Sequence, residues 1–225
     1  MRVVNLSTVA DYEAQNKDIL TGAAGGDAHI SIADGAVVIL RGVTISPTDS
    51  TLAWPAILCK GDATIILEGM SLVKCCHYRY PGILVPEGKT LVIEGPGSLS
   101  VCSKGNGAGI GGGYQVPCGN IHIKSGFIVA QGGMGGAGIG GGYYAACGSI
   151  RIEGGTITAL AGNMAAAIGS GLNGTCGDIT LVKGVIYLTA RLGECGDYSV
   201  ESIGRGAGGK CGTVINDLPE ESISM

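Results

Sequence analysis

Two glutamates have the spacing of a catalytic or metal-binding carboxylate pair. Glu68 and Glu94 each follow an alternating apolar segment and lie 26 residues apart. If these segments stack as successive turns of a coil, the two side chains lie about 5 Å apart. A retaining glycosidase uses a similar separation, and a calcium ion could also bridge the two carboxylates. The favoured interpretation is a surface ladder of charges, in which Arg41 and Lys124 flank the pair.

The aromatic side chains point to a carbohydrate-binding surface. The chain has only one Trp, eight Tyr and one Phe, yet Trp54 and Tyr80 hold equivalent repeat positions, as do Tyr114 and Tyr143. This placement predicts two stacked aromatic pairs at corners of a coil. Exposed rings stack on sugar rings; the alternative is an aromatic ladder that only stabilises the corners. The candidate ligand-binding residues are Trp54, His77, Tyr78, Arg79, Tyr80, Tyr114, Tyr143 and Tyr144.

The cysteines follow the same repeat. Cys118, Cys147 and Cys176 are spaced by 29 residues, and Cys59 and Cys211 are placed equivalently. The favoured interpretation is a ladder of buried thiols, which pack as small apolar groups. Disulfides between stacked turns are the alternative. With nine cysteines, at least one has no partner within the chain. The spacing gives no zinc-site signature.

Two other chemical signals are weaker. The segment 107–112, Gly-Ala-Gly-Ile-Gly-Gly, matches a dinucleotide-binding pattern. That pattern binds a pyrophosphate only where a helix follows, and Pro117 and the return of the motif at 136–142 indicate a structural corner instead. His29, His77 and His122 are too far apart in the repeat to form a triad or a metal site, and each is expected at the surface.

A periodic core must position all of these residues. Isoleucines recur at intervals of 26 to 35 residues, at Ile30, Ile57, Ile83, Ile110, Ile139, Ile168 and Ile203. Two further apolar columns are Leu40, Leu67, Ile93, Ile123, Ile152, Leu181 and Ile45, Leu72, Leu99, Ile128, Ile157, Ile186. Three short strands per repeat predict an all-β fold, a single-stranded right-handed parallel β-helix (β-solenoid) of about seven rungs of 26–29 residues.

The repeat also predicts the organisation of the chain. Residues 1–28 lack the repeat and are expected to cap the open apolar end. The β-helix should occupy residues 29–215, and residues 216–225 form a polar tail. Strand alternation places Ile39, Ile66 and Val92 on the outside. This apolar stripe is expected to be covered by the cap or by a partner, so the chain is a monomer or a dimer formed through it.

Composition limits the partners. The net charge is −4, which gives no electrostatic basis for nucleic-acid binding. The sequence contains no run of twenty apolar residues, so no membrane insertion is expected. The start of the chain shows no apolar leader core.

Four segments resemble the bacterial β-helical carbohydrate-binding domains, which share the pectin-lyase-like fold: residues 19–22, 37–45, 61–67 and 86–93. The Gly-Ala-Gly-Ile-Gly-Gly-Gly and Cys-Gly-x-Ile repeats look like those of secreted surface proteins from gut-type bacteria. The resemblance implies binding of pectin-like or cellulosic glycans, sometimes with calcium, at an extracellular or cell-surface location. The acidic cluster with a basic residue that lyases carry is absent from the sequence.

The sequence therefore predicts a non-catalytic β-helix that binds a polysaccharide or surface glycan through exposed aromatics, without a cofactor unless calcium binds Glu68 and Glu94. The alternative is a structural spacer or adhesin segment that binds a protein partner through loops 74–80 and 191–201. A polysaccharide lyase or hydrolase is the third possibility.

Overall fold

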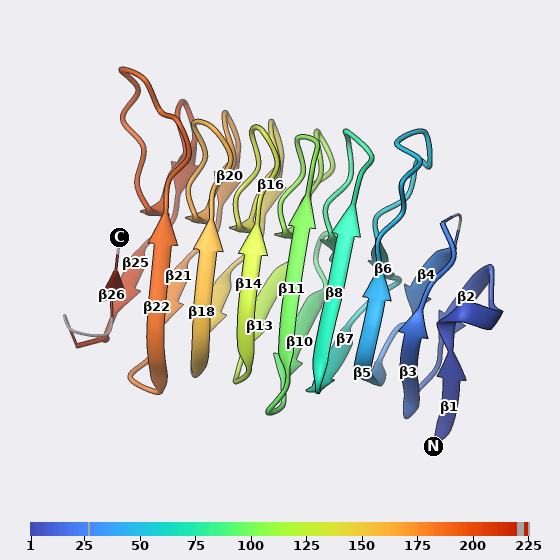
Figure 1. Ribbon diagram of the computed structural model, residues 1–225. Helices are drawn as coiled ribbons and strands as arrows, with labels where there is room; N and C mark the ends of the chain where they lie inside the picture. Colours follow the sequence, from blue (N-terminus) through green and yellow to red (C-terminus); the bar gives the residue numbers. More distant parts are fainter. Residues whose placement is uncertain (27, 220–222, 225) are drawn as a thin grey trace.

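The computed structural model describes residues 1–26, 28–219 and 223–224. The chain is a right-handed parallel β-helix, and the two termini lie at opposite ends of the rod (Figure 1). Among the described residues, the helix η1 (Leu6–Thr8) is a single 3-10 turn, and no helix there has the length and apolar character needed to cross a membrane.

One face of the rod is the row of arrows at the front of Figure 1. Its strands are β1 (Arg2–Asn5), β3 (Asp18–Ala23), β5 (Ala36–Ile45), β8 (Met70–Cys75), β11 (Ser98–Ser103), β14 (Phe127–Gln131), β18 (Gly155–Leu160), β22 (Val185–Arg191) and β26 (Ile223–Ser224). The long strand β5 pairs with β8 near its end and with β7 near its start, so this face is continuous with the next one.

The adjoining face contains β7 (Ala63–Glu68), β10 (Thr90–Glu94), β13 (Asn120–Ile123), β17 (Ile150–Ile152), β21 (Ile179–Leu181) and β25 (Val214–Asn216). A second sheet has eight strands: β2 (Asp11–Ala14), β4 (His29–Ile32), β6 (Ile57–Cys59), β9 (Ile83–Leu84), β12 (Ile110–Gly111), β15 (Ile139–Gly140), β19 (Ile168–Gly169) and β23 (Ile203–Gly204). A third sheet closes the C-terminal rungs with β16 (Ala146–Cys147), β20 (Thr175–Cys176) and β24 (Lys210–Cys211).

The isoleucine column of the second sheet is confirmed. Ile57 pairs with Ile83, and the same register continues through Ile110, Ile139 and Ile168 to Ile203. Each of these residues except Ile203 is fully buried. Within this second sheet, the seven strands that follow β2 correspond to the seven predicted rungs. β2 itself adds one more strand, from the segment expected to be a cap.

Parallel pairing extends beyond both expected boundaries of the β-helix. Within residues 1–28, β1 pairs with β3, β3 with β5 and β2 with β4. At the other end, β26 pairs with β22, and Leu218 is buried in the core. The residues of β1 (RVVN) and β3 (DILTGA) do not alternate strictly between polar and apolar, so the strand pattern is weak there. Buried Leu6 of η1 packs into the core at the N-terminal end of the rod.

Two predicted columns are shifted in register. The structure pairs Ile93 with Ile65, two positions before the predicted partner Leu67, because the turn from β9 to β10 is two residues longer than the turn from β6 to β7. Leu72 and Ile186 were expected inside, but Val73 and Leu188 take the core positions. The shift from Leu72 to Val73 is one residue, and an odd shift reverses the face of a side chain. For Ile186 the cause is a β-bulge opposite Gly155 and Thr156.

One buried carboxylate fastens the first rung. Asp18 is only 4% exposed, and it accepts hydrogen bonds from the Tyr12 hydroxyl (2.6 Å), the Gln15 amide (2.8 Å) and Arg2 (3.1 Å). Burial acts to raise the pKa of Asp18, but these hydrogen bonds outweigh it, so the pKa lies below its ordinary value.

We therefore expect Asp18→Ala to lower the free energy of unfolding by about 1.5–3 kcal/mol at neutral pH, because Tyr12, Gln15 and Arg2 lose a charged, buried acceptor. A lowered folded-state pKa means that the contribution is present above the unfolded pKa of about 3.9 and is lost as the pH falls through the folded value. Urea titrations at neutral pH and at about pH 2 measure the difference in unfolding free energy between parent and variant. An equal difference at both pH values would contradict this role.

Candidate functional site

Four tyrosines form a continuous aromatic surface across three rungs, the tyrosine row: Tyr78, Tyr114, Tyr143 and Tyr144. Their ring centroids are separated by 6.4 Å (Tyr78 to Tyr114), 5.5 Å (Tyr114 to Tyr143) and 4.3 Å (Tyr143 to Tyr144). Tyr78 is 55% exposed and Tyr144 is 51% exposed. The predicted pairing of Tyr114 with Tyr143 is therefore present, and the structure extends it at both ends.

Backbone hydrogen bonds between rungs hold the tyrosine row in place. The Tyr114 amide donates to the Arg79 carbonyl at 2.7 Å, and the Tyr144 amide donates to the Leu172 carbonyl at 2.9 Å. The Tyr143 amide donates to the Asn106 carbonyl at 3.0 Å. The main chain that carries Tyr114, Tyr143 and Tyr144 is therefore fixed to neighbouring rungs.

The corner that carries the row has an unusual backbone. Gln115, Tyr144, Asn173 and Gly208 occupy equivalent places in successive rungs, and their φ angles are 54°, 55°, 54° and 63°. This left-handed region suits glycine and tolerates asparagine, but it is costly for a bulky side chain. Tyr144 therefore occupies a position at which a smaller residue would make the fold more stable.

His77 lies at the inner end of the row. Its ring is 4.9 Å from that of Tyr78 and 5.2 Å from that of Tyr80. Contrary to the expectation of a surface position, His77 is 8% exposed, and this burial lowers its pKa. Its Nδ1 accepts a hydrogen bond from the Arg79 amide at 3.2 Å. The buried Nε of Arg79 has no hydrogen-bond partner within the described part of the chain.

Trp54 lies apart from the tyrosine row. Its ring is 4.9 Å from that of His29, and no ring contact joins it to Tyr80 in the part of the chain that the structure describes. The two loops differ in length and composition, so equivalent spacing before the column isoleucines does not place the two rings together. Trp54 instead borders a hollow of about 300 Å³ on the second sheet, near Lys60 and Glu13.

Glu68 and Glu94 are not stacked, so the expected pair is absent. Glu68 is level with Arg41, and Glu94 is level with Ile66. The cause is the two-residue register shift that also moves Ile93. Each carboxylate has its own cation: Glu68 bonds Arg41 Nε at 2.7 Å, and Glu94 lies 3.3 Å from Lys124 Nζ.

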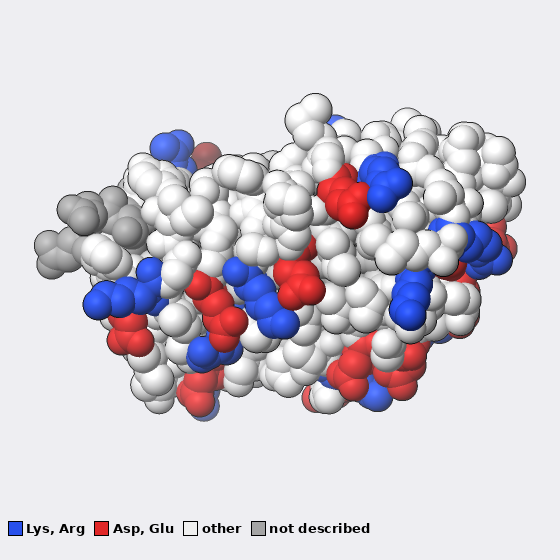
Figure 2. Space-filling model, turned by 90° about the horizontal axis from the view of Figure 1, so that it is seen from below, with Lys and Arg blue, Asp and Glu red and all other residues white. Residues whose placement is uncertain are grey.

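Other charged side chains also form ion pairs, such as Lys60 with Glu13 and Lys89 with Asp34. Figure 2 shows acidic and basic side chains side by side across one face, with no broad patch of one sign. Among the described residues, no group of three or more His, Cys, Asp or Glu side chains is arranged to hold a metal ion. Neither catalysis by paired carboxylates nor a calcium site at Glu68 and Glu94 has geometric support here.

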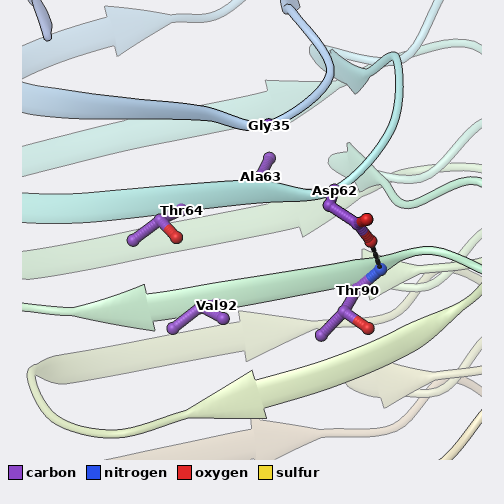
Figure 3. Close-up of a pocket in the computed structure, with 6 residues that line it drawn as sticks. All are labelled: Gly35, Asp62, Ala63, Thr64, Thr90 and Val92. Atoms are coloured by element: carbon purple, nitrogen blue, oxygen red, sulfur yellow. Dashed lines mark hydrogen bonds between the residues drawn. The ribbon is translucent and has the colours of Figure 1, made fainter. Parts of the chain in front are cut away.

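A small hollow on the face of β5, β7 and β10 contains a carboxylate, Asp62 (Figure 3). Its Oδ1 accepts a hydrogen bond from the Thr90 amide at 2.8 Å, and Asp34 makes the same bond to the Asp62 amide. These side chains link one rung to the next, which explains their presence without a ligand.

The predicted apolar stripe on this face is interrupted. Ile39 and Ile66 are level with each other, but Val92 pairs with Thr64 in the neighbouring column. Ile39 is only 7% exposed.

The front face contains an apolar groove that was not predicted from the sequence. It has a volume of about 420 Å³ and is lined in part by Met70, Leu72, Phe127 and Val129. Met70 is 82% exposed and Phe127 57%. The alternation of β8 contained the signal, because an inward Val73 requires an outward Leu72.

Comparison with known proteins supports the fold. Residues 121–143 and 150–172 match the family model of the beta helix repeat. No curated protein and no solved structure matches the chain. The central rungs, which carry Tyr143 at the end of the first matched segment, are thus similar to the beta helix repeat, and the whole chain has the corresponding parallel β-helix fold.

Proposed function

We propose that the protein is a non-catalytic carbohydrate-binding β-helix that holds a polysaccharide against the tyrosine row at an extracellular or cell-surface location. The observation that carries this proposal is the left-handed backbone of Tyr144, whose φ is 55°. Strain of this kind persists where a side chain serves a function, at a cost of order 1–3 kcal/mol. An aromatic ladder that only stabilised the corner would gain from Asn or Gly at this position.

The geometry of the row suits an extended polymer. The rings come from successive rungs and therefore follow the axis of the rod, so a sugar chain lying along that axis meets one ring after another. Tyrosine offers a flat apolar face together with a hydroxyl group. The exposed side chain of Gln115 stands next to Tyr114 and can donate to and accept from sugar hydroxyls.

Tyr144→Asn separates binding from stability. Asparagine tolerates the left-handed backbone, as Asn173 does one rung further on. We expect the variant to unfold at the same or a higher urea concentration than the parent, while its affinity for polysaccharide falls at least about tenfold, as for a central aromatic contact. Affinity gel electrophoresis against immobilised pectin-like and cellulosic polysaccharides measures the binding.

Phe127→Ala is the matched control, because Phe127 is 57% exposed on another face of the rod. It should leave retention in the gel unchanged. We expect retention without added calcium, since Glu68 and Glu94 each form an ion pair with a basic side chain, Arg41 and Lys124 respectively. Unchanged retention of Tyr144→Asn and of Tyr114→Ala, with a parent that binds, would exclude the tyrosine row as the site.

A second candidate function is a spacer or adhesin segment that binds a protein partner through loops 74–80 and 191–201. The loop after β22 projects beyond the turns of the other rungs (Figure 1), and it exposes Tyr198 at 63% and Leu192 at 37%. If the parent is retained by none of the polysaccharides, this function becomes the favoured one, and exchanging the loop for the shorter turn of the preceding rung should then remove partner binding.

A further inference from the structure

The outward side chains of the front face alternate in size from rung to rung. One column presents, in successive rungs, Met70, Ser98, Phe127, Thr156 and Tyr187. The column two residues further along each strand presents Leu72, Ser100, Val129, Thr158 and Thr189. Both columns are large, small, large and small in the same four rungs. The face therefore has ridges that repeat every two rungs, about 9.6 Å apart.

These ridges are apolar and open to solvent. Met70, Phe127, Val129 and Tyr187 are all exposed. The two columns contain no charged residue, and Lys74 lies in the next column, toward the edge of the face. The apolar groove of about 420 Å³ is the space between the first two ridges, above the small residues of β11. A contiguous apolar surface of this kind marks an interaction site.

We propose that the front face binds the front face of a second copy of this chain, with the two rods antiparallel. The two-fold axis lies in the interface, parallel to the strands, and passes between the rungs of β11 and β14. A dimer of this symmetry is isologous, so each contact occurs twice. Phe127 and Val129 of each copy then fill the groove over Ser98 and Ser100 of the other copy.

The same axis opposes the remaining large and small residues. Met70 of one copy meets Thr156 of the second copy, and Leu72 meets Thr158 of the second copy. A two-fold axis along the rod would instead place each rung opposite itself, and an axis through β14 would place Phe127 against Phe127. Either arrangement sets ridge against ridge, so complementarity in size selects the antiparallel arrangement with its axis between rungs.

The face is large enough for a specific dimer. The six strands from β5 to β22, at about 4.8 Å each, and strands about 20 Å long give a buried area of about 1,150 Å² for the two copies together. A specific interface needs about 1,000 Å². Since this dimer is at the small end of the range, we expect a dissociation constant of about 1–10 µM. At lower concentrations the chain is a monomer, so Phe127→Ala there remains a control for polysaccharide retention, which depends on the tyrosine row of each copy.

The first test measures molar mass against concentration. Sedimentation velocity of the full chain from about 0.1 to 100 µM spans the expected dissociation constant, and the mass should rise from 22.4 kDa to twice that value. Ser100→Glu and Val129→Lys each place a charge in the apolar interface, so each should weaken the dimer at least about a hundredfold. Both side chains are exposed, so the urea midpoints of the variants should match the parent.

Thiols need a control, because a disulfide between copies would imitate this dimer. All nine cysteines are free, and four form the predicted column: Cys118, Cys147, Cys176 and Cys211. Cys59 instead pairs with Ile32 in the second sheet. Cys102 lies beside the second column of the front face and is partly exposed. All measurements therefore contain a reductant that is not a thiol, and Cys102→Ser should dimerise like the parent.

A mixture of the two charged variants tests the register. Ser100→Glu of one chain faces Val129→Lys of the other, so an equimolar mixture should recover the dimer although neither variant dimerises alone. Ser100→Glu mixed with Thr44→Lys is the matched control, because Thr44 lies two rungs from Ser100 and at the far end of the face; this mixture should stay monomeric.

Three outcomes overturn the proposal. A parent that remains monomeric at about 100 µM leaves the face to an apolar ligand or to a different protein. A parent dimer that persists in both single variants must be formed through another face. A mixture of Ser100→Glu and Val129→Lys that does not recover the dimer contradicts the antiparallel arrangement.

Discussion

Ile139→Asp is expected to prevent folding of the chain. Ile139 is fully buried and lies in register between Ile110 and Ile168 in the second sheet. The substitution removes about 1.5–3 kcal/mol of burial and places a carboxylate where no cation can reach it, which costs several kcal/mol more. A domain of this size is stable by only about 5–15 kcal/mol. Far-UV circular dichroism and the soluble yield of the variant measure the result.

Lys124→Ala is the control, because Lys124 follows β13 and its side chain lies on the outside of the β-helix. The Lys124 side chain is 45% exposed and forms one ion pair, 3.3 Å from Glu94. An exposed pair of this kind contributes about 0–1 kcal/mol, so the urea midpoint should barely move. If Ile139→Asp folded and melted like the parent, the isoleucine column could not be the interior of the rod.

The isoleucine column could be predicted because its strands are short and uniform. Each one after β9 is an Ile-Gly step, and the fixed identity of the two residues leaves no ambiguity in register. The register of the columns on the two long faces was harder to predict. A turn that gains two residues before Thr90 leaves the inward and outward pattern intact but changes every partner. The predicted carboxylate pair assumed that Glu94 lies level with Glu68. The alternation of inward and outward residues was predicted correctly, but Glu94 lies level with Ile66 instead.

The candidate site was predicted in part for a similar reason. Tyr114 and Tyr143 lie in almost identical repeats, so equal spacing placed them together. Trp54 and Tyr80 lie in loops of different sequence, where spacing from a strand does not fix the path of the chain. The left-handed backbone at Tyr144 was not predicted either, although Asn173 and Gly208 hold the same place in later repeats and are the residue types that favour it.

Gly140→Ala is expected to be almost as damaging as a charge in the core. Gly140 has a φ of 132°, and its equivalents Gly111, Gly169 and Gly204 have values of 134°, 135° and 135°. A β-carbon at Gly140 would overlap the carbonyl oxygen of Gly169 and approach Ile150 Cδ1 to 3.1 Å. The strained backbone alone costs about 1–3 kcal/mol, and relief of the overlap requires two rungs to separate.

Gly88→Ala isolates the backbone contribution. Gly88 also has a positive φ, 73°, but a β-carbon there would have no atom within 4 Å. We expect a loss of about 1–2 kcal/mol for this variant and a clearly larger loss for Gly140→Ala in urea titrations. Because each rung contacts only its neighbours, separation at Gly140 should also divide unfolding into two transitions. A single transition with equal losses for both variants would mean that the rungs do not approach closely at this corner, and the Gly-Ile-Gly-Gly-Gly repeat would then need another explanation.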